Sequence, residues 1–174
     1  MKHITYFILI TIILAFTGCK HDKVDFNNPD VSTFVAQLKA GTYQTKGPSG
    51  FVEVPRFTKA DIPELMKYVT DMSTIKDFPL PPNSIYMHAG KFRLGECIMW
   101  IIESVRRGGS ASEGCQLVRA SSHHGESLIL SDKEMKKVAH LYRDWWSSVL
   151  FRNGNSLANL YSHSPLDNTE YIWN

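Results

Sequence analysis

The most apolar periodic segment of the chain runs Leu94-Gly95-Glu96-Cys97-Ile98-Met99-Trp100-Ile101-Ile102-Glu103-Ser104-Val105-Arg106-Arg107-Gly108. Apolar side chains recur in it at the spacing of one helix face, and Met99 and Trp100 add apolar surface on the other side. A helix that is apolar nearly all round is usually buried in the centre of a domain. Arg106 and Arg107 suit the negative end of the helix dipole, and Gly108 is a typical stop. The segment therefore predicts a central, buried helix.

An amphipathic helix is expected before this segment. Asn28 is a good N-cap, Pro29 fits the first helical position, and Gly41 supplies the stop. Its apolar face consists of Val31, Phe34, Val35 and Leu38.

Two more helices are expected, one before and one after the central helix in the sequence. The first begins between Thr58 and Asp61, with Pro63 in its first turn and an apolar face of Ile62, Leu65, Met66 and Val69. The second has a capping box, Ser131 at the N-cap and Glu134 three positions on, and Gly154 closes it. Its apolar positions are Met135, Val138, Ala139, Tyr142, Trp145, Trp146, Val149 and Leu150.

The remaining segments read as long connections. Residues 116–118 and 128–130 are candidate short strands within a loop of unusual length, and residues 171–173 are expected to dock back on the domain. We therefore predict a mostly α-helical fold, a single irregular domain over residues 29–174 with about four main helices and long loops.

Composition narrows the class of protein. The 174 residues are 43% apolar and 21% charged, with a formal net charge of +2. These values exclude a disordered tail, a coiled-coil rod and a nucleic-acid binder built on a strong basic face. No cofactor motif is recognised, because the chain has no nucleotide-binding glycine loop and no GxSxG elbow.

The N-terminus has the layout of a secretory signal peptide over residues 1–18, with a basic start and an apolar segment too short to span a bilayer. Phe16-Thr17-Gly18-Cys19 resembles the lipobox of bacterial lipoproteins, which implies a lipid on Cys19 and a membrane attachment. Residues 19–28 then read as a polar tether that keeps the domain close to the membrane. The expected location is the outer membrane of the cell envelope, on either its periplasmic or its surface face.

Cys97 and Cys115 remain once Cys19 is assigned to lipid. In an oxidising compartment the pair could form a disulfide that ties the central helix to the loop after it. The alternative is that Cys97 is a buried free thiol, since it lies on the apolar helix face.

Two polar groups are candidates for chemistry. His123, His124 and Glu126 could bind zinc, although their spacing is not that of a metalloprotease helix and an exposed loop explains them equally well. Glu96 and Glu103 lie seven residues apart on the central helix and could serve as acid and base. The simpler interpretation pairs Glu96 with Arg93, and Glu103 with Arg107.

The runs 57–65, 93–103, 141–146 and 165–173 together resemble an uncharacterised family of small Bacteroidetes lipoproteins, and more loosely HEAT-type helix pairs. The resemblance implies a compartment and a helical fold, and no catalytic residue. The expected function is thus a non-enzymatic envelope lipoprotein that binds a protein or glycan partner. The alternative is a small metal-dependent or acid/base hydrolase that uses His123, His124 and Glu126 with Glu96.

Overall fold

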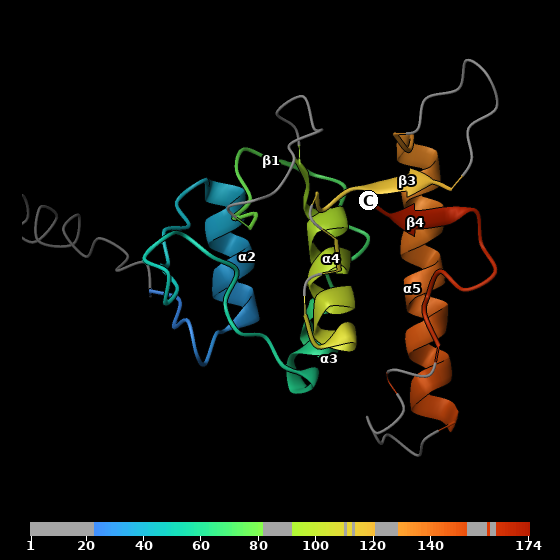
Figure 1. The fold of residues 1–174 in the computed structure, drawn as a ribbon, viewed down its shortest axis with the longest axis horizontal. Coiled ribbons are helices and arrows are strands. Elements are labelled where there is room, and N and C mark those ends of the chain that lie inside the picture. Colours follow the sequence, from blue (N-terminus) through green and yellow to red (C-terminus); the bar gives the residue numbers. More distant parts are fainter. Residues whose placement is uncertain are drawn as a thin grey trace, which may run out of the picture.

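The computed structural model describes residues 23–81, 92–109, 111–112, 114–120, 129–152, 160 and 163–174. Helices predominate in this part of the chain, which confirms the coarse prediction, and two small antiparallel sheets accompany them. The longest helices are α2 (Val31–Ala40), α4 (Leu94–Arg107) and α5 (Asp132–Arg152). Figure 1 shows α4 standing between α2 and α5. None of the helices in the described residues is both long enough and apolar enough to cross a membrane.

Helix α4 is the centre of the core, as its composition predicts. Every residue from Leu94 to Glu103 is buried, including both glutamates. At its end Gly108 adopts a left-handed conformation, φ 72°, and its N–H closes the helix. The expected stop is therefore confirmed.

Gly95 allows the first turn of α4 to lie directly on another segment of backbone. Its N–H donates to the Asp71 carbonyl at 2.7 Å. A Cβ at this position would lie 2.4 Å from the Val69 carbonyl oxygen and 2.9 Å from that of Asp71. Because backbone atoms cannot move aside as a flexible side chain can, only glycine fits here.

Helix α2 begins two residues later than the sequence suggested. Asp30, not Asn28, is the N-cap, and its carboxylate accepts the Thr33 N–H at 2.7 Å. The N–H of Asn28 instead donates to the Asp25 carboxylate at 3.0 Å, so Asn28 belongs to the preceding turn. The left-handed cap at Gly41 and the buried face of Val31, Phe34, Val35 and Leu38 are as expected.

The second expected helix is much shorter than predicted. A 3-10 turn, η1 (Lys59–Asp61), leads into α3 (Ile62–Leu65), and residues 66–70 form turns. The start is as expected, with Thr58 and Asp61 forming a capping box. The apolar set Ile62, Leu65, Met66 and Val69 is buried although the helix ends early.

Two small antiparallel sheets join segments that are far apart in the sequence. Strand β1 (Thr74–Ile75) pairs with β2 (Phe92–Arg93), which runs straight into α4. Strand β3 (Leu117–Arg119) pairs antiparallel with the C-terminal β4 (Tyr171–Trp173), and Val118 also bridges Ile129. The expected docking of the C-terminal tail is confirmed.

Helix α5 carries the predicted capping box, in which Ser131 and Glu134 exchange hydrogen bonds. Hydrogen bonds from two indole N–H groups hold the C-terminal segment on this helix. Trp173 Nε1 donates to the Tyr142 hydroxyl at 3.0 Å, and Trp145 Nε1 donates to the His163 carbonyl at 2.9 Å. Trp145 is buried and Trp146 is half-buried against the core. Gly154, the expected end, lies outside the described residues.

Replacement of Gly95 by alanine tests the close packing of α4 on the backbone of residues 69–71. We expect Gly95→Ala to lower the free energy of unfolding by about 1–3 kcal/mol, because the clash with two carbonyls outweighs the higher helix propensity of alanine. Denaturant unfolding measures this change.

Gly109→Ala is the matched control, since a Cβ there would meet nothing within 4 Å and the residue has no left-handed φ. It should leave the unfolding midpoint almost unchanged. Equal stability of the two variants would show that α4 does not rest on the backbone of residues 69–71.

Candidate functional site

A cleft of about 830 Å³ runs between residues 48–59 and the second half of α4. Its size is typical of a site that takes a ligand or a chain segment. The described residues that line it are Phe26, Pro48, Ser49, Glu53, Val54, Pro55, Arg56, Phe57, Thr58, Lys59, Trp100, Ile101, Ser104, Val105, Gly108 and Gly109.

The wall of the cleft formed by α4 is mainly apolar, and its polar groups on Trp100 and Ser104 already have hydrogen-bond partners within the protein. Trp100 is buried and donates its Nε1 proton to the Ser112 hydroxyl at 3.1 Å, so its polar edge is engaged elsewhere. The Ser104 hydroxyl donates to the Trp100 carbonyl at 2.8 Å and accepts the Ala111 N–H at 3.0 Å. This wall therefore offers a ligand mainly apolar contact.

The opposite wall carries the charge. Among the described lining residues, Arg56 and Lys59 are the cations and Glu53 is the one carboxylate, which accepts a hydrogen bond from the Ser49 hydroxyl. The Arg56 guanidinium lies 5.6 Å from the centre of the Phe26 ring, a cation–π distance. Two cations against one bonded carboxylate favour an acidic ligand.

A smaller cavity of about 200 Å³ lies on the other side of the same segment, between it and the end of α2. Tyr43 lines it, and its hydroxyl donates to the Glu53 carbonyl at 2.6 Å. Asp77 is the one charged side chain among its described lining residues. The small volume and sparse polar groups make it a weaker candidate.

Glu96 is the most perturbed carboxyl group of α4. It is 2% exposed, and burial raises its pKa to about 7 despite the Leu117 N–H and Arg93. Oε1 accepts the Leu117 N–H at 2.9 Å, while Oε2 lies 3.7 Å from Arg93 and has no hydrogen-bond partner among the described residues. Desolvation thus outweighs a distant arginine.

Glu103 does not join Glu96 in a site. It binds Arg106 at 2.5 and 2.8 Å, whereas the sequence suggested Arg107, whose guanidinium donates to the Ala111 carbonyl. Arg106 is favoured because i,i+3 neighbours also share a helix face. Seven residues of helix separate the two glutamates by about 10 Å, too far for one acid/base pair.

Cys97 and Cys115 are both fully buried and are not bridged in this structure, and one hydrogen bond joins their thiols. Burial raises the pKa of both thiols. The sequence left a disulfide and a buried free thiol open for this pair, and the disulfide stays a prediction for the oxidised protein. Thiol counting on unfolded, non-reduced protein separates the two states, because two free thiols besides Cys19 exclude the bridge.

The other predicted site residues, Cys19, His123, His124 and Glu126, lie outside the described residues. Within the described part of the chain no three His, Cys, Asp or Glu side chains gather as a metal site would require. Sequence reasoning missed the cleft, since it treated residues 41–57 as a linker. Its only signal was the aromatic and cationic run Arg56-Phe57-Thr58-Lys59.

The comparisons with known proteins name a family and no activity. A family model described as a domain of unknown function (DUF4943) matches residues 25–174. No curated protein and no solved structure matches the chain. The expectation of an uncharacterised family is therefore confirmed.

The raised pKa of Glu96 predicts a pH dependence of stability. The folded chain holds the Glu96 proton up to about pH 7, whereas the unfolded chain releases it near the ordinary pKa of 4.5. The free energy of unfolding should therefore fall as the pH rises from about 4.5 to 7, then stay level. Glu96→Gln keeps the acceptor for the Leu117 N–H and removes this loss, so its advantage over the wild type should grow to at most about 3 kcal/mol at pH 8.

Urea unfolding at a series of pH values checks this slope. Glu64→Gln, at an exposed ion pair with Lys67, is the control and should run parallel to the wild type. A constant difference between Glu96→Gln and the wild type from pH 4 to pH 8 would contradict the account.

Proposed function

Because the chain belongs to the DUF4943 family, whose description assigns no activity, we propose a function from its own residues. We infer a lipid-anchored protein of the cell envelope that binds an acidic segment of a partner protein in the cleft beside α4. It acts as a binding module and not as an enzyme.

The anchor is proposed from the N-terminal sequence. Residues 4–16 are mostly apolar, and Gly18 and Cys19 follow with the small-residue–cysteine order of a lipoprotein signal. Several acyl chains on Cys19 would hold the protein stably at a membrane, where one chain would not. The outer membrane is the proposed location.

The binding role rests on one observation, the large cleft with an apolar wall and a cationic wall. An acidic peptide can place apolar side chains against the half-buried Phe57 and Val105 and its carboxylates near Arg56 and Lys59. The indole of Trp100, which could stack on a sugar ring, is 4% exposed. A protein segment therefore fits better than a glycan.

The cleft lining also favours binding over catalysis. Its described members include one carboxylate, Glu53, and no histidine or cysteine, so they supply no acid with a matching base. Glu96 is buried and does not line the cleft. The hydrolase built on His123, His124 and Glu126 is not supported by any contact of the described residues, and it stays a prediction from the sequence. The HEAT-type likeness and the Bacteroidetes origin also stay predictions.

Site-specific photocrosslinking in intact cells tests the proposal. A photoreactive residue at Gly109, where a side chain enters open space at the cleft, should capture a discrete partner protein. The paired change Arg56→Glu and Lys59→Glu should reduce this capture by about tenfold or more, because it reverses the charge of the cationic wall.

Two controls make the result specific. Lys133→Glu with Lys136→Glu, both exposed on α5, should leave the Gly109 crosslink unchanged. A photoreactive residue at Lys136 in an otherwise wild-type chain should capture none of the same partner. Equal capture by the cleft variant and the α5 variant would contradict the proposed site, and a crosslinked product without peptide would indicate a glycan instead.

A further inference from the structure

The N-terminal segment is fixed to one end of the domain. Val24 is 3% exposed and belongs to the core, and its carbonyl accepts the Thr45 hydroxyl proton at 3.0 Å. Two residues later the Phe26 carbonyl accepts the Arg56 N–H at 2.8 Å. Part of the segment expected to be a tether is thus packed on the domain, and the place where the chain joins the domain is set beside Thr45.

A loop of residues 46–52 begins at the next residue after Thr45. Lys46 and Val52 form a bridge, and the Glu53 N–H donates to the Thr45 carbonyl, so the loop projects as a narrow hairpin. Gly50 turns the tip with φ 84°, a conformation that side chains disfavour. A hairpin of this length reaches about 10 Å beyond its base.

The returning arm of the 46–52 loop exposes an aromatic ring, at Phe51, whose carbonyl accepts the Gly47 N–H at 2.9 Å. Phe51 is 63% exposed, more than any other large apolar side chain of the described residues, and Lys46 at the base is exposed too. An exposed aromatic ring and an exposed cation on one loop are the kinds of side chain that favour a membrane interface. The nearby carboxylates of Asp25 and Glu53 are occupied, by backbone N–H groups and by the Ser49 hydroxyl.

The number of residues between Cys19 and Val24 limits how far this end of the domain can lie from a lipid on Cys19. Five residue steps join Cys19 to Val24, which span at most about 18 Å when extended. If Cys19 carries lipid, as proposed above, the base of the 46–52 loop is held within that distance of the acyl chains. The loop can then reach the headgroup region.

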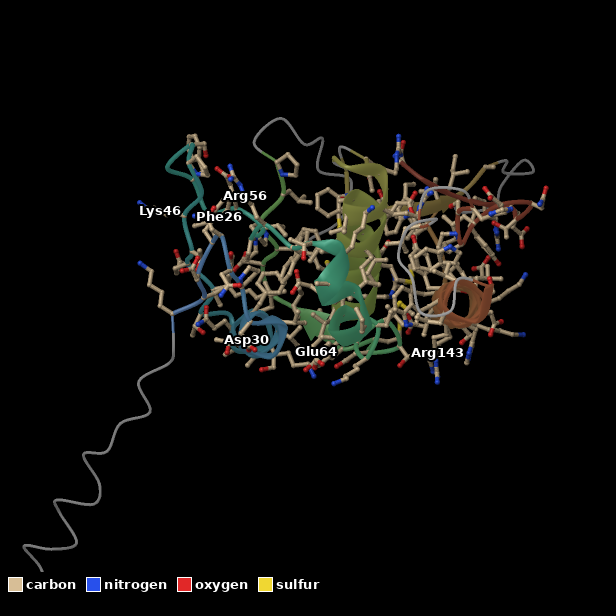
Figure 2. All side chains as sticks on the ribbon, turned by 90° about the horizontal axis from the view of Figure 1, so that it is seen from below. Phe26, Asp30, Lys46, Arg56, Glu64 and Arg143 are labelled. Carbon is tan, nitrogen blue, oxygen red and sulfur yellow. The ribbon has the colours of Figure 1, made fainter. Side chains whose placement is uncertain are left out.

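We propose that the 46–52 loop docks on the lipid bilayer, with Phe51 in the interface and the long axis of the domain directed away from the membrane. This rests on the proposed lipid at Cys19. Figure 2 shows Phe26, Lys46 and Arg56 at one end of the long axis and Arg143 toward the other. The other strongly exposed apolar residues, Ile129 and Ile172, flank Val118 at the β3–β4 sheet, beyond α4 from α2 (Figure 1), and so face away from the bilayer.

Fluorescence quenching by brominated lipids tests the proposal on the full lipoprotein. Phe51→Trp keeps an aromatic ring on the 46–52 loop, and Arg143→Trp places the same reporter at an exposed site on α5. Both proteins are reconstituted in phosphatidylcholine–phosphatidylglycerol vesicles with brominated acyl chains. The wild type, with its four native tryptophans, gives the background.

The emission added by Phe51→Trp should be mostly lost in brominated vesicles and retained in unbrominated ones. The emission added by Arg143→Trp should be the same in both. Equal quenching of the two reporters, in protein that floats with the vesicles, would overturn the docking of the loop while leaving the lipid anchor intact. In vesicle flotation, Cys19→Ala gives the behaviour of protein without the lipid. If the wild type also failed to float with the vesicles, the anchor and the docking would both be overturned.

Discussion

The contact between Gly95 and the carbonyl oxygens of Val69 and Asp71 sets how the rest of the domain is arranged. It brings the first turn of α4 to backbone distance from the segment after α3, which no side chain would permit. Helix α4 can then be enclosed from Leu94 to Glu103, with α2 and α5 on either side (Figure 1). The domain is organised around this enclosed helix.

Enclosure has an electrostatic consequence, because the helix carries two glutamates into the core. Glu103 is stabilised by a close ion pair with Arg106. Among the described residues Glu96 has only a distant arginine and one N–H donor, and burial raises its pKa to about 7. A raised pKa in this setting follows from burial and does not by itself indicate catalysis. The second half of α4 emerges from the core and forms the apolar wall of the cleft.

Local signals in the sequence predicted much of this fold. The capping box at Ser131 and Glu134, the glycine stops at 41 and 108, and the apolar faces depend on near neighbours, so they were predicted correctly. The N-cap at Asp30 was missed because Asn28 and Asp30 are both favourable capping residues, and only the structure shows that the Asp30 carboxylate accepts the Thr33 N–H. The cleft was missed for a different reason: it joins residues 48–59 to α4, and no local pattern reports such a contact.

The central claim is that α4 is the enclosed element on which the core and the cleft are both built. Native-state hydrogen exchange measures this most directly, since amides in the most enclosed element exchange only through global unfolding. The account predicts that the amides of residues 98–103 are the slowest in the protein, with an opening free energy equal to that of global unfolding. Faster exchange in α4 than in α5 would contradict it.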